Sequence, residues 1–185
     1  NPLALGMTLL IAAFYAMGAL ELQRFNQATR TLGQALSTLA HAAEPQPGLG
    51  DWLAHVPETL RHAVRLRIEG ERVALPGPAL TPYLAGLLVL LGMLGTFLGM
   101  VVTLNGTGLA LEQAKDLQTM RDSLAAPVRG LGLAFGTSVA GVAASAMLGL
   151  MTALCRRERV QVAQRLDACT ATTLRPFTRA HQREE

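Results

Sequence analysis

Hydrophobic and polar positions are separated into blocks along this chain. Three runs, at residues 1–20, 73–111 and 130–155, contain no charged residue. A helix that crosses a lipid bilayer needs about 20 mostly apolar residues, and each run contains such a stretch. We therefore predict an all-α, polytopic membrane protein whose three transmembrane helices lie at 1–21, 82–106 and 130–155.

Helical periodicity continues outside the first uncharged run. Apolar side chains recur at alternating spacings of three and four, at Leu22, Phe25, Thr29, Leu32, Leu36 and Leu39. This pattern predicts that the first transmembrane helix extends beyond the bilayer with one apolar face. The helix should end near Glu44, because the segment from Pro45 to Gly50 is rich in proline and glycine.

Two further segments show the same helical spacing. One comprises Trp52, Leu53, Val56, Leu60 and Val64, and the other comprises Val160, Ala163, Leu166, Thr170 and Leu174. We predict a helical segment over 22–81, a short link over 107–129, and a helical tail over 156–185 that continues the third helix until Pro176. The apolar faces of these helices are expected to pack against one another.

The distribution of basic residues predicts the orientation of the helices. Of the 16 Lys and Arg residues, six lie between Glu21 and Arg72, seven lie after Cys155, and three lie in the 107–129 link. Cytoplasmic loops of membrane proteins carry an excess of Lys and Arg. Segment 22–81 and the tail are therefore predicted to be cytoplasmic, and the link external.

Composition excludes several classes of protein. The two cysteines form no C-x-x-C or Cys/His cluster, and aromatic residues make up only 4% of the chain, so neither a metal site nor nucleic-acid binding is predicted. No phosphate-binding loop, nucleophile elbow or H-E-x-x-H pair occurs. We therefore expect no enzyme activity and no cofactor.

Small residues are frequent in the second and third helices. They are predicted to pack helices closely, because small side chains allow backbones to approach where lipid provides no hydrophobic drive for association. The residues are Gly92, Gly95 and Gly99 in the second helix, and Gly132, Gly136, Ala140 and Ala144 in the third. The pattern leaves open whether the packing is within a subunit, between subunits or against a partner.

The few polar residues in these helices are hydroxyls. Thr96 and Thr103 share a face of the second helix, and Thr137 and Ser145 share a face of the third, with Ser138 adjacent. They are explained either by hydrogen bonds to the carbonyl one turn back or by a weakly polar lining for a water-filled path. No Asp, Glu, His, Lys or Arg lies inside the three uncharged runs, although ion pathways usually need such a residue. If ions pass, a partner must therefore supply that group.

Two sequence stretches resemble a known family. Leu87 to Met100, LLVLLGMLGTFLGM, resembles the G-L-L-G-T-V-x-G-M signature of the MotA/TolQ/ExbB proton-channel family. Gly132 to Ala144, GLAFGTSVAGVAA, is similar to that family's last helix, although the proline that many members have shortly after the threonine is absent. The arginine-rich tail is similar to long-tailed variants, such as the motor subunit of Zorya-type phage-defence systems.

The resemblance implies a homopentameric ring in the bacterial inner membrane. The ring would surround two copies of a single-span partner, similar to MotB, ExbD or TolR, that carries a membrane Asp. Protons, or in some members sodium ions, would pass near that Asp and drive movement of the partner. By motif position Thr96 and Thr137 correspond to the pore threonines, and helical position adds Ser138, Ser145 and Thr103.

Two hypotheses therefore follow from the sequence. The first is a stator subunit that conducts ions and drives a motor with the proton-motive force. The second is a non-conducting membrane scaffold that anchors a cytoplasmic helical tail. The first predicts threonine faces turned towards a partner helix, and the second predicts a sealed helix bundle.

Overall fold

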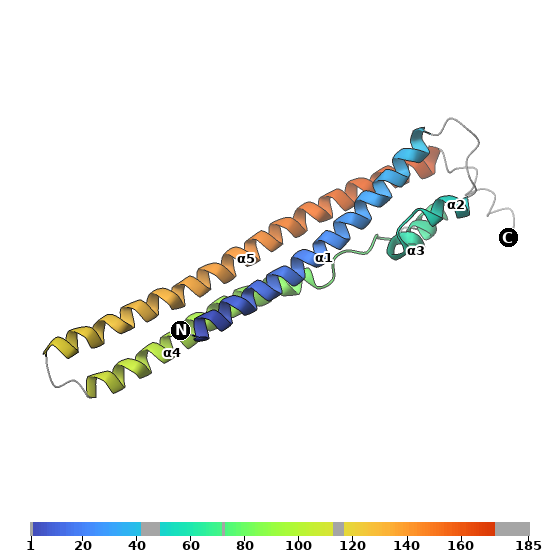
Figure 1. The fold of residues 1–185 in the computed structure, drawn as a ribbon. Coiled ribbons are helices and arrows are strands. Elements are labelled where there is room, and N and C mark those ends of the chain that lie inside the picture. The colour runs from blue at the N-terminus through green and yellow to red at the C-terminus, as the bar shows by residue number, and fades with distance from the viewer. Residues whose placement is uncertain (1, 42–48, 72, 113–116, 173–185) are drawn as a thin grey trace. The chain divides into compact units, whose positions relative to one another are not determined.

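A computed structural model describes residues 2–41, 49–71, 73–112 and 117–172. Within these residues the secondary structure is helical, without strands, as Figure 1 shows. The helices are α1 (Pro2–His41), α2 (Leu49–Ala54), α3 (Glu58–Ile68), α4 (Thr81–Glu112) and α5 (Leu117–Thr172). The predicted all-α class is confirmed. Residues 113–116 of the predicted link and 173–185 of the predicted tail, with Leu174 and Pro176, lie outside the described residues.

Three helices are long and apolar enough to cross a membrane. The segments that contain a sufficiently apolar window are Pro2–Leu39, Thr81–Gly108 and Gly130–Thr172. Each overlaps one of the three helices predicted from the uncharged runs. The structure therefore agrees with the prediction of three membrane-spanning helices and indicates a membrane protein.

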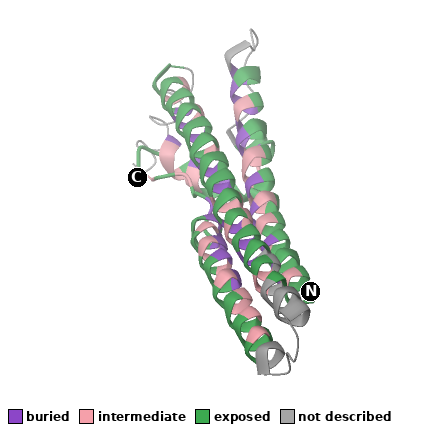
Figure 2. Cartoon of the chain, turned by 90° about the vertical axis from the view of Figure 1, so that its left-hand side faces the viewer, coloured by how far each residue is buried: buried purple, intermediate pink, exposed green. Residues whose placement is uncertain are grey.

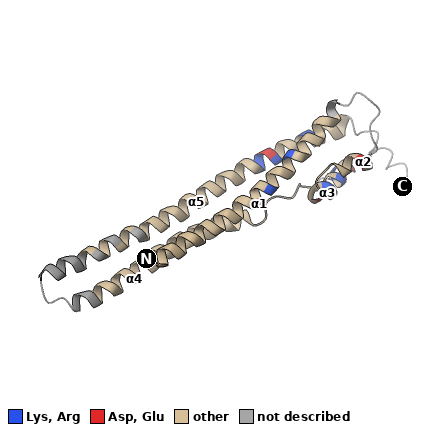
Figure 3. Cartoon of the chain, viewed as in Figure 1, with Lys and Arg blue, Asp and Glu red and all other residues tan. Residues whose placement is uncertain are grey.

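The chain divides into two compact units. One, here called the apolar unit, comprises Asn1–Leu20 and Ala79–Leu150; the other, called the polar unit, comprises Glu21–Pro78 and Met151–Glu185. Helices α1 and α5 contribute residues to both units because each runs from an uncharged segment into a charged one. In Figure 3 the residues of α1 and α5 that are coloured as Lys, Arg, Asp or Glu lie in the part of each helix that follows its uncharged run.

Both long helices continue as the sequence pattern predicts. Helix α1 spans 40 residues, from Pro2 to His41, and the end predicted near Glu44 lies outside the described residues. Helix α5 spans 56 residues and passes through Pro127, which has no backbone N–H to donate to the preceding turn. Because α4 reaches Glu112 and α5 begins at Leu117, the described part of the 107–129 link is helical.

The polar unit has a hydrophobic core between α1, the short helices α2 and α3, and α5. The predicted apolar faces of α1 and of α2 and α3 supply most of it, and Leu166 supplies a fully buried side chain from α5. Trp52 is buried, and its indole N–H donates a hydrogen bond of 3.1 Å to the carbonyl of Ala35. Figure 2 shows buried residues, in purple, recurring at intervals along the helices.

The α5 side of this core differs from the prediction at one position. Val160 was expected on the packed face, but its side chain is 55% exposed. The preceding residue, Arg159, is buried instead, with 6% of its surface exposed. The prediction placed the apolar residue inward, whereas the guanidinium group finds hydrogen-bond partners there that an apolar residue cannot use.

Arg159 connects three segments of the polar unit. Its guanidinium donates hydrogen bonds to the Thr29 hydroxyl (2.8 Å) and to the backbone carbonyls of Pro76 (3.0 Å) and Phe25 (3.1 Å). It also lies 3.9 Å from the centre of the Phe25 ring, a cation–π distance. Arg159 lies beyond the third uncharged run, and burial lowers its pKa to about 10.

Candidate functional site

The candidate site lies in the apolar unit, where α4 and α5 pack against each other. The closest approach is at Gly92 and Gly141. A Cβ atom added to Gly141 would lie 2.7 Å from both the Cα of Gly92 and the carbonyl oxygen of Leu88. A Cβ added to Gly92 would lie 3.1 Å from the carbonyl oxygen of Ser138. Because these neighbours are backbone atoms, which cannot move aside cheaply, the contact requires glycine at Gly141.

The same interface continues along both helices. A Cβ added to Gly95 would lie 2.6 Å from Oγ1 of Thr137, and one added to Gly99 would lie 2.6 Å from Cβ of Ala134. Further along, Gly130 faces the side chain of Thr103. The α4–α5 interface therefore pairs ascending positions on α4 with descending positions on α5, as expected of antiparallel helices.

Thr137 lies inside this interface. Its side chain is 5% exposed, and its hydroxyl donates a hydrogen bond of 2.7 Å to the carbonyl of Ala134. The neighbouring Gly95 position is also approached by α1, where Cε of Met7 would lie 3.6 Å from an added Cβ. Thr137 therefore faces the centre of its own three-helix unit.

Thr96 is placed differently. It follows Gly95, which contacts Thr137, so the two threonines lie at nearly the same level along the α4–α5 pair. Thr96 is only half-buried, and its hydroxyl donates a hydrogen bond of 2.6 Å to the carbonyl of Met93. Of the two motif threonines, Thr96 is thus the one with access to the surface of the unit.

The three other predicted pathway residues lie along the same helix pair. Thr103 is half-buried and donates a hydrogen bond of 2.7 Å to the carbonyl of Gly99. Ser138 and Ser145 are also half-buried. The i−3 and i−4 hydrogen bonds of the three threonines agree with the simpler of the two interpretations, in which a hydroxyl satisfies itself on its own helix.

A small cavity lies where α1, α4 and α5 meet. Its volume is about 20 Å³, enough for roughly one water molecule. Its lining includes Met7 from α1, Gly99 and Thr103 from α4, and Ala134 and Thr137 from α5. Within one chain, this cavity is too small to form a continuous path along the unit.

The small residues predicted to pack helices fall into two groups. Gly92, Gly95 and Gly99 all lie in the α4–α5 interface. Gly132 and Gly136 lie outside it: both are exposed, and a Cβ added to either would meet nothing within 4 Å. Ala140 and Ala144 are half-buried. Their predicted role in packing against another subunit or a partner stays a prediction.

The small-residue pattern did not include the α5 residues that make the contact with α4, although Thr137 among them was predicted as a pathway residue. These residues are Gly130, Ala134, Thr137 and Gly141. They are four, three and four residues apart, and the residues that they meet on α4, in order Thr103, Gly99, Gly95 and Gly92, are four, four and three apart. Small residues at mixed spacings of three and four on both helices, rather than repeats of four on one helix, are the signal that could have found them.

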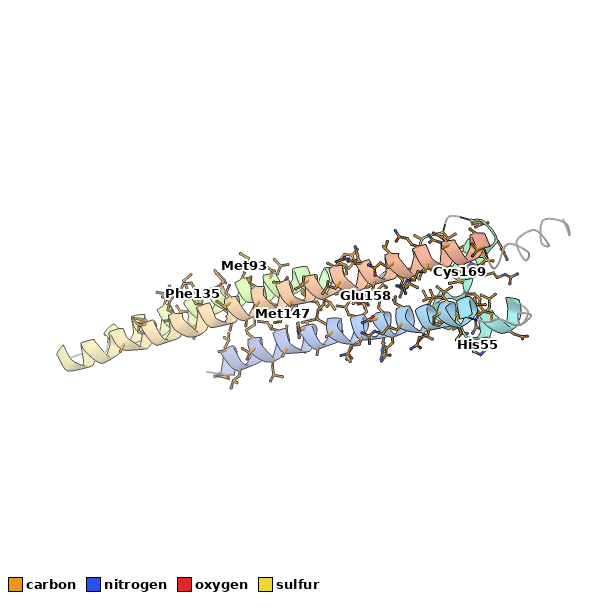
Figure 4. The ribbon with its side chains drawn as sticks, turned by 90° about the horizontal axis from the view of Figure 1, so that it is seen from above. His55, Met93, Phe135, Met147, Glu158 and Cys169 are labelled. Carbon is orange, nitrogen blue, oxygen red and sulfur yellow. The ribbon has the colours of Figure 1, made fainter. Side chains whose placement is uncertain are left out.

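The outer faces of the pair are strongly apolar. Met93 and Phe135 are each 60% exposed, and Figure 4 shows them on the side of α4 and α5 that points away from α1. Among the described residues, no group of three His, Cys, Asp or Glu side chains is arranged to hold a metal ion. What the site offers is therefore hydroxyl groups, close backbone contacts and an apolar surface.

No protein-family model matches the chain, and comparison with curated proteins found no match.

Proposed function

We propose that this chain is the ion-pathway subunit of a membrane motor driven by the proton-motive force, as its resemblance to the MotA/TolQ/ExbB family implies. In this proposal, five copies form a ring in a bacterial inner membrane around a dimer of a single-span partner. Segment 22–81 and the tail lie in the cytoplasm. The transported ion is the proton, with sodium as the alternative, and the chain has no catalytic activity of its own.

One observation carries the proposal. The contact between Gly95 and Thr137 brings the threonines of the two family-like motifs to one level of the α4–α5 pair. We assign contact with the partner to Thr96, which is half-buried, and a supporting role behind it to Thr137, which is buried. The hydroxyl groups would donate to and accept from the carboxyl group of the partner as it gains and loses a proton.

The need for a partner follows from charge. The uncharged runs contain no Asp, Glu, His, Lys or Arg, and moving ions through a membrane usually requires an ionisable group. A single Asp on the partner's transmembrane helix would supply it. The exposed apolar faces of α4 and α5 provide surface for both neighbouring subunits and the partner.

A second function is supported by a different observation. Thr137 is 5% exposed, and the cavity beside it measures about 20 Å³. A sealed three-helix unit of this kind suits a non-conducting scaffold that anchors the polar unit to the membrane. In that case the hydroxyls serve only the hydrogen bonds within their own helices.

Proton flux through reconstituted liposomes distinguishes the two functions. The chain is co-expressed with a candidate partner, a protein with one transmembrane helix that carries an Asp, and dye-reported proton uptake is measured under a potassium-diffusion potential. We expect flux only when both proteins are present. Thr96→Val should reduce it by about tenfold or more, since removing one charge-stabilising hydrogen bond costs about 1.5–3 kcal/mol.

The matched control is Thr8→Val. Thr8 lies in α1 of the same unit, is exposed, and donates a hydrogen bond of 2.9 Å to its own helix at Ala4, as Thr96 does at Met93. Flux should survive this change. Flux that also survives Thr96→Val, Thr137→Val and loss of the partner's Asp would exclude the motor and leave the scaffold.

A further inference from the structure

Two exposed arginines lie just beyond the uncharged runs of α1 and α5. Arg24 is four residues after the run that ends at Leu20, and Arg156 directly follows the run that ends at Cys155. No carboxylate of the described residues lies within ion-pair distance of either guanidinium, whereas Arg65 and Arg67 are paired with acidic side chains. The charges of Arg24 and Arg156 are therefore available to a ligand.

The packing of α1 against α5 in the polar unit brings the two arginines to one level. Arg159 hydrogen-bonds to Thr29, which precedes it by 130 residues, and Val162 faces Gly33 with nearly the same offset. With this offset Arg24 is level with Leu154. Arg156 then lies two residues further, or about 3 Å along the axis at 1.5 Å per residue.

The two arginines also lie on one side of the helix pair. Thr29 faces α5, and the next residue, Arg30, lines a groove of about 440 Å³ together with Glu158, the residue before Arg159. In parallel helices, the residue after a contact on one helix and the residue before a contact on the other share a side. Arg24 directly precedes Phe25, whose carbonyl contacts Arg159. Arg156 directly follows Cys155, which lies one turn before Arg159 on α5. Each arginine is thus displaced from the α1–α5 contact in the opposite sense to Arg30 and Glu158, so both lie on the side opposite this groove.

The position and chemistry of these arginines identify a ligand. Guanidinium groups match phosphate oxygens with a planar fork of donors, and basic residues immediately beyond a membrane helix lie at the level of lipid headgroups. The nearby acidic residue of α1, Glu21, is half-buried, so the exposed charge on this side is positive. We propose that Arg24 and Arg156 together bind the phosphate of an anionic phospholipid. This site requires only that the chain spans a membrane, and it is independent of motor activity.

Lipid titration followed by native mass spectrometry tests the site. The full chain, with any partner that co-purifies, is delipidated in detergent and titrated with dioleoylphosphatidylglycerol or dioleoylphosphatidylcholine. We expect preferential retention of the glycerol lipid. The double variant R24Q/R156Q should weaken its binding by about 10- to 30-fold, from about 1 kcal/mol for each basic residue at the surface.

The control variant R30Q/R165Q removes the same charge from the same two helices. Arg30 and Arg165 are exposed but lie ten residues beyond each uncharged run, about 15 Å along the helix. This variant should bind the glycerol lipid as the wild type does, and R24K/R156K should retain most of the binding because it keeps both charges. Circular dichroism establishes that each variant retains its helical content.

Several results would overturn the site. They are equal retention of the two lipids, equal losses in R24Q/R156Q and R30Q/R165Q, or displacement of the lipid by excess inorganic phosphate, which would indicate a site for free anions. If R24Q/R156Q fails to fold, a salt titration of the wild-type chain tests the site instead. Binding of the glycerol lipid must then weaken as sodium chloride is raised, and binding that is insensitive to salt excludes the site.

Discussion

Arg159 carries a positive charge into the interior of the polar unit without an acidic partner among the described residues. Its charge is balanced by the carbonyl dipoles of Phe25 and Pro76, the hydroxyl of Thr29 and the face of the Phe25 ring. Such an arrangement restricts the orientation of the two helices more strictly than apolar packing does, because each N–H donor must point at its acceptor. Arg159 therefore sets how α5 is rotated against α1.

Replacing Arg159 with alanine should destabilise the polar unit. We expect Arg159→Ala to lower the free energy of unfolding by about 2 kcal/mol, since hydrogen bonds from a charged group contribute about 1.5–3 kcal/mol each and relief of the buried charge offsets part of the loss. Trp52, the single tryptophan and a buried residue of this unit, reports unfolding by fluorescence. Arg165→Ala, at an exposed position of α5, serves as the control and should change stability by less than about 0.5 kcal/mol.

The ion pair between Arg67 and Asp167 predicts a dependence of stability on pH. Arg67 donates to both carboxylate oxygens of Asp167, at 2.6 and 2.9 Å, and this hydrogen bonding lowers the pKa of Asp167. The pair therefore stabilises the fold above the unfolded pKa of Asp167, about 3.9, and this contribution is lost as the pH falls through the lower folded value. Because half of the Asp167 side chain is exposed, we expect only about 0.5–1 kcal/mol.

A double-mutant cycle isolates that contribution. Unfolding of the wild type, Arg67→Gln, Asp167→Asn and the double variant is measured at neutral pH and near pH 3. The coupling energy should be largest at neutral pH and smaller near pH 3, where protonation of Asp167 has begun to remove it. A coupling energy that does not change with pH would contradict the assignment to Asp167.

The α4–α5 interface is determined by where glycine occurs on both helices at once. At Gly92 and Gly141 the two backbones touch, and at Gly95 and Gly99 the partner side chains from α5 fill the space that a Cβ would occupy. Lipid is as apolar as the helices, so their association depends on this close contact rather than on exclusion of water. The interface should therefore be sensitive to added volume at the contact and insensitive elsewhere.

Valine substitutions on α5 test this expectation. Gly141→Val should lower the stability of the apolar unit by about 1–3 kcal/mol, because the added atoms meet the backbone of α4. Gly136→Val has the same intrinsic effect on the helix but meets nothing within 4 Å, so it should cost less than about 1 kcal/mol. Unfolding in mixed micelles, followed by circular dichroism, measures both. Equal losses would show that the contact does not hold the helices together.

A single copy of the chain exposes a large apolar surface, which in the molecule must be covered by lipid, by further copies or by a partner. In the apolar unit the exposed residues include Gly132 and Gly136 beside Phe135, which is 60% exposed. If these glycines pack against a neighbouring subunit, as the sequence pattern predicts, a bulky residue should disturb assembly and leave the single chain folded.

The mass of the assembly in detergent measures this. The wild type is expected at five times the chain mass of 19.6 kDa, plus any partner. Gly136→Leu should shift the population to smaller species while its helical content is unchanged. A wild-type monomer, or a pentamer that tolerates the leucine, would contradict the predicted subunit contact.

The periodic pattern of apolar residues was sufficient to predict the helices. The uncharged runs identified three helices able to span a membrane, and the spacing from Leu22 to Leu39 predicted the continuation of α1. These features depend on residues close in sequence, so they can be read from one chain. The two family-like motifs also predicted Thr96 and Thr137 as a pair. The contact between Gly95 and Thr137 places both threonines at one level along the α4–α5 pair.

The rotation of each helix about its axis depended on its neighbours. Spacing by four on α5 predicted packing at Gly132 and Gly136 without saying against which helix, and within the chain the contact with α4 uses Gly130, Ala134 and Gly141 instead. Likewise, Val160 was predicted to be buried, but its side chain is exposed and the neighbouring Arg159 is buried instead. A helix carries small and apolar residues on several faces, and its own sequence does not rank them. The face that packs is the one whose small residues and hydrogen-bond donors match those of the opposing helix, and that match arises only when the two helices meet.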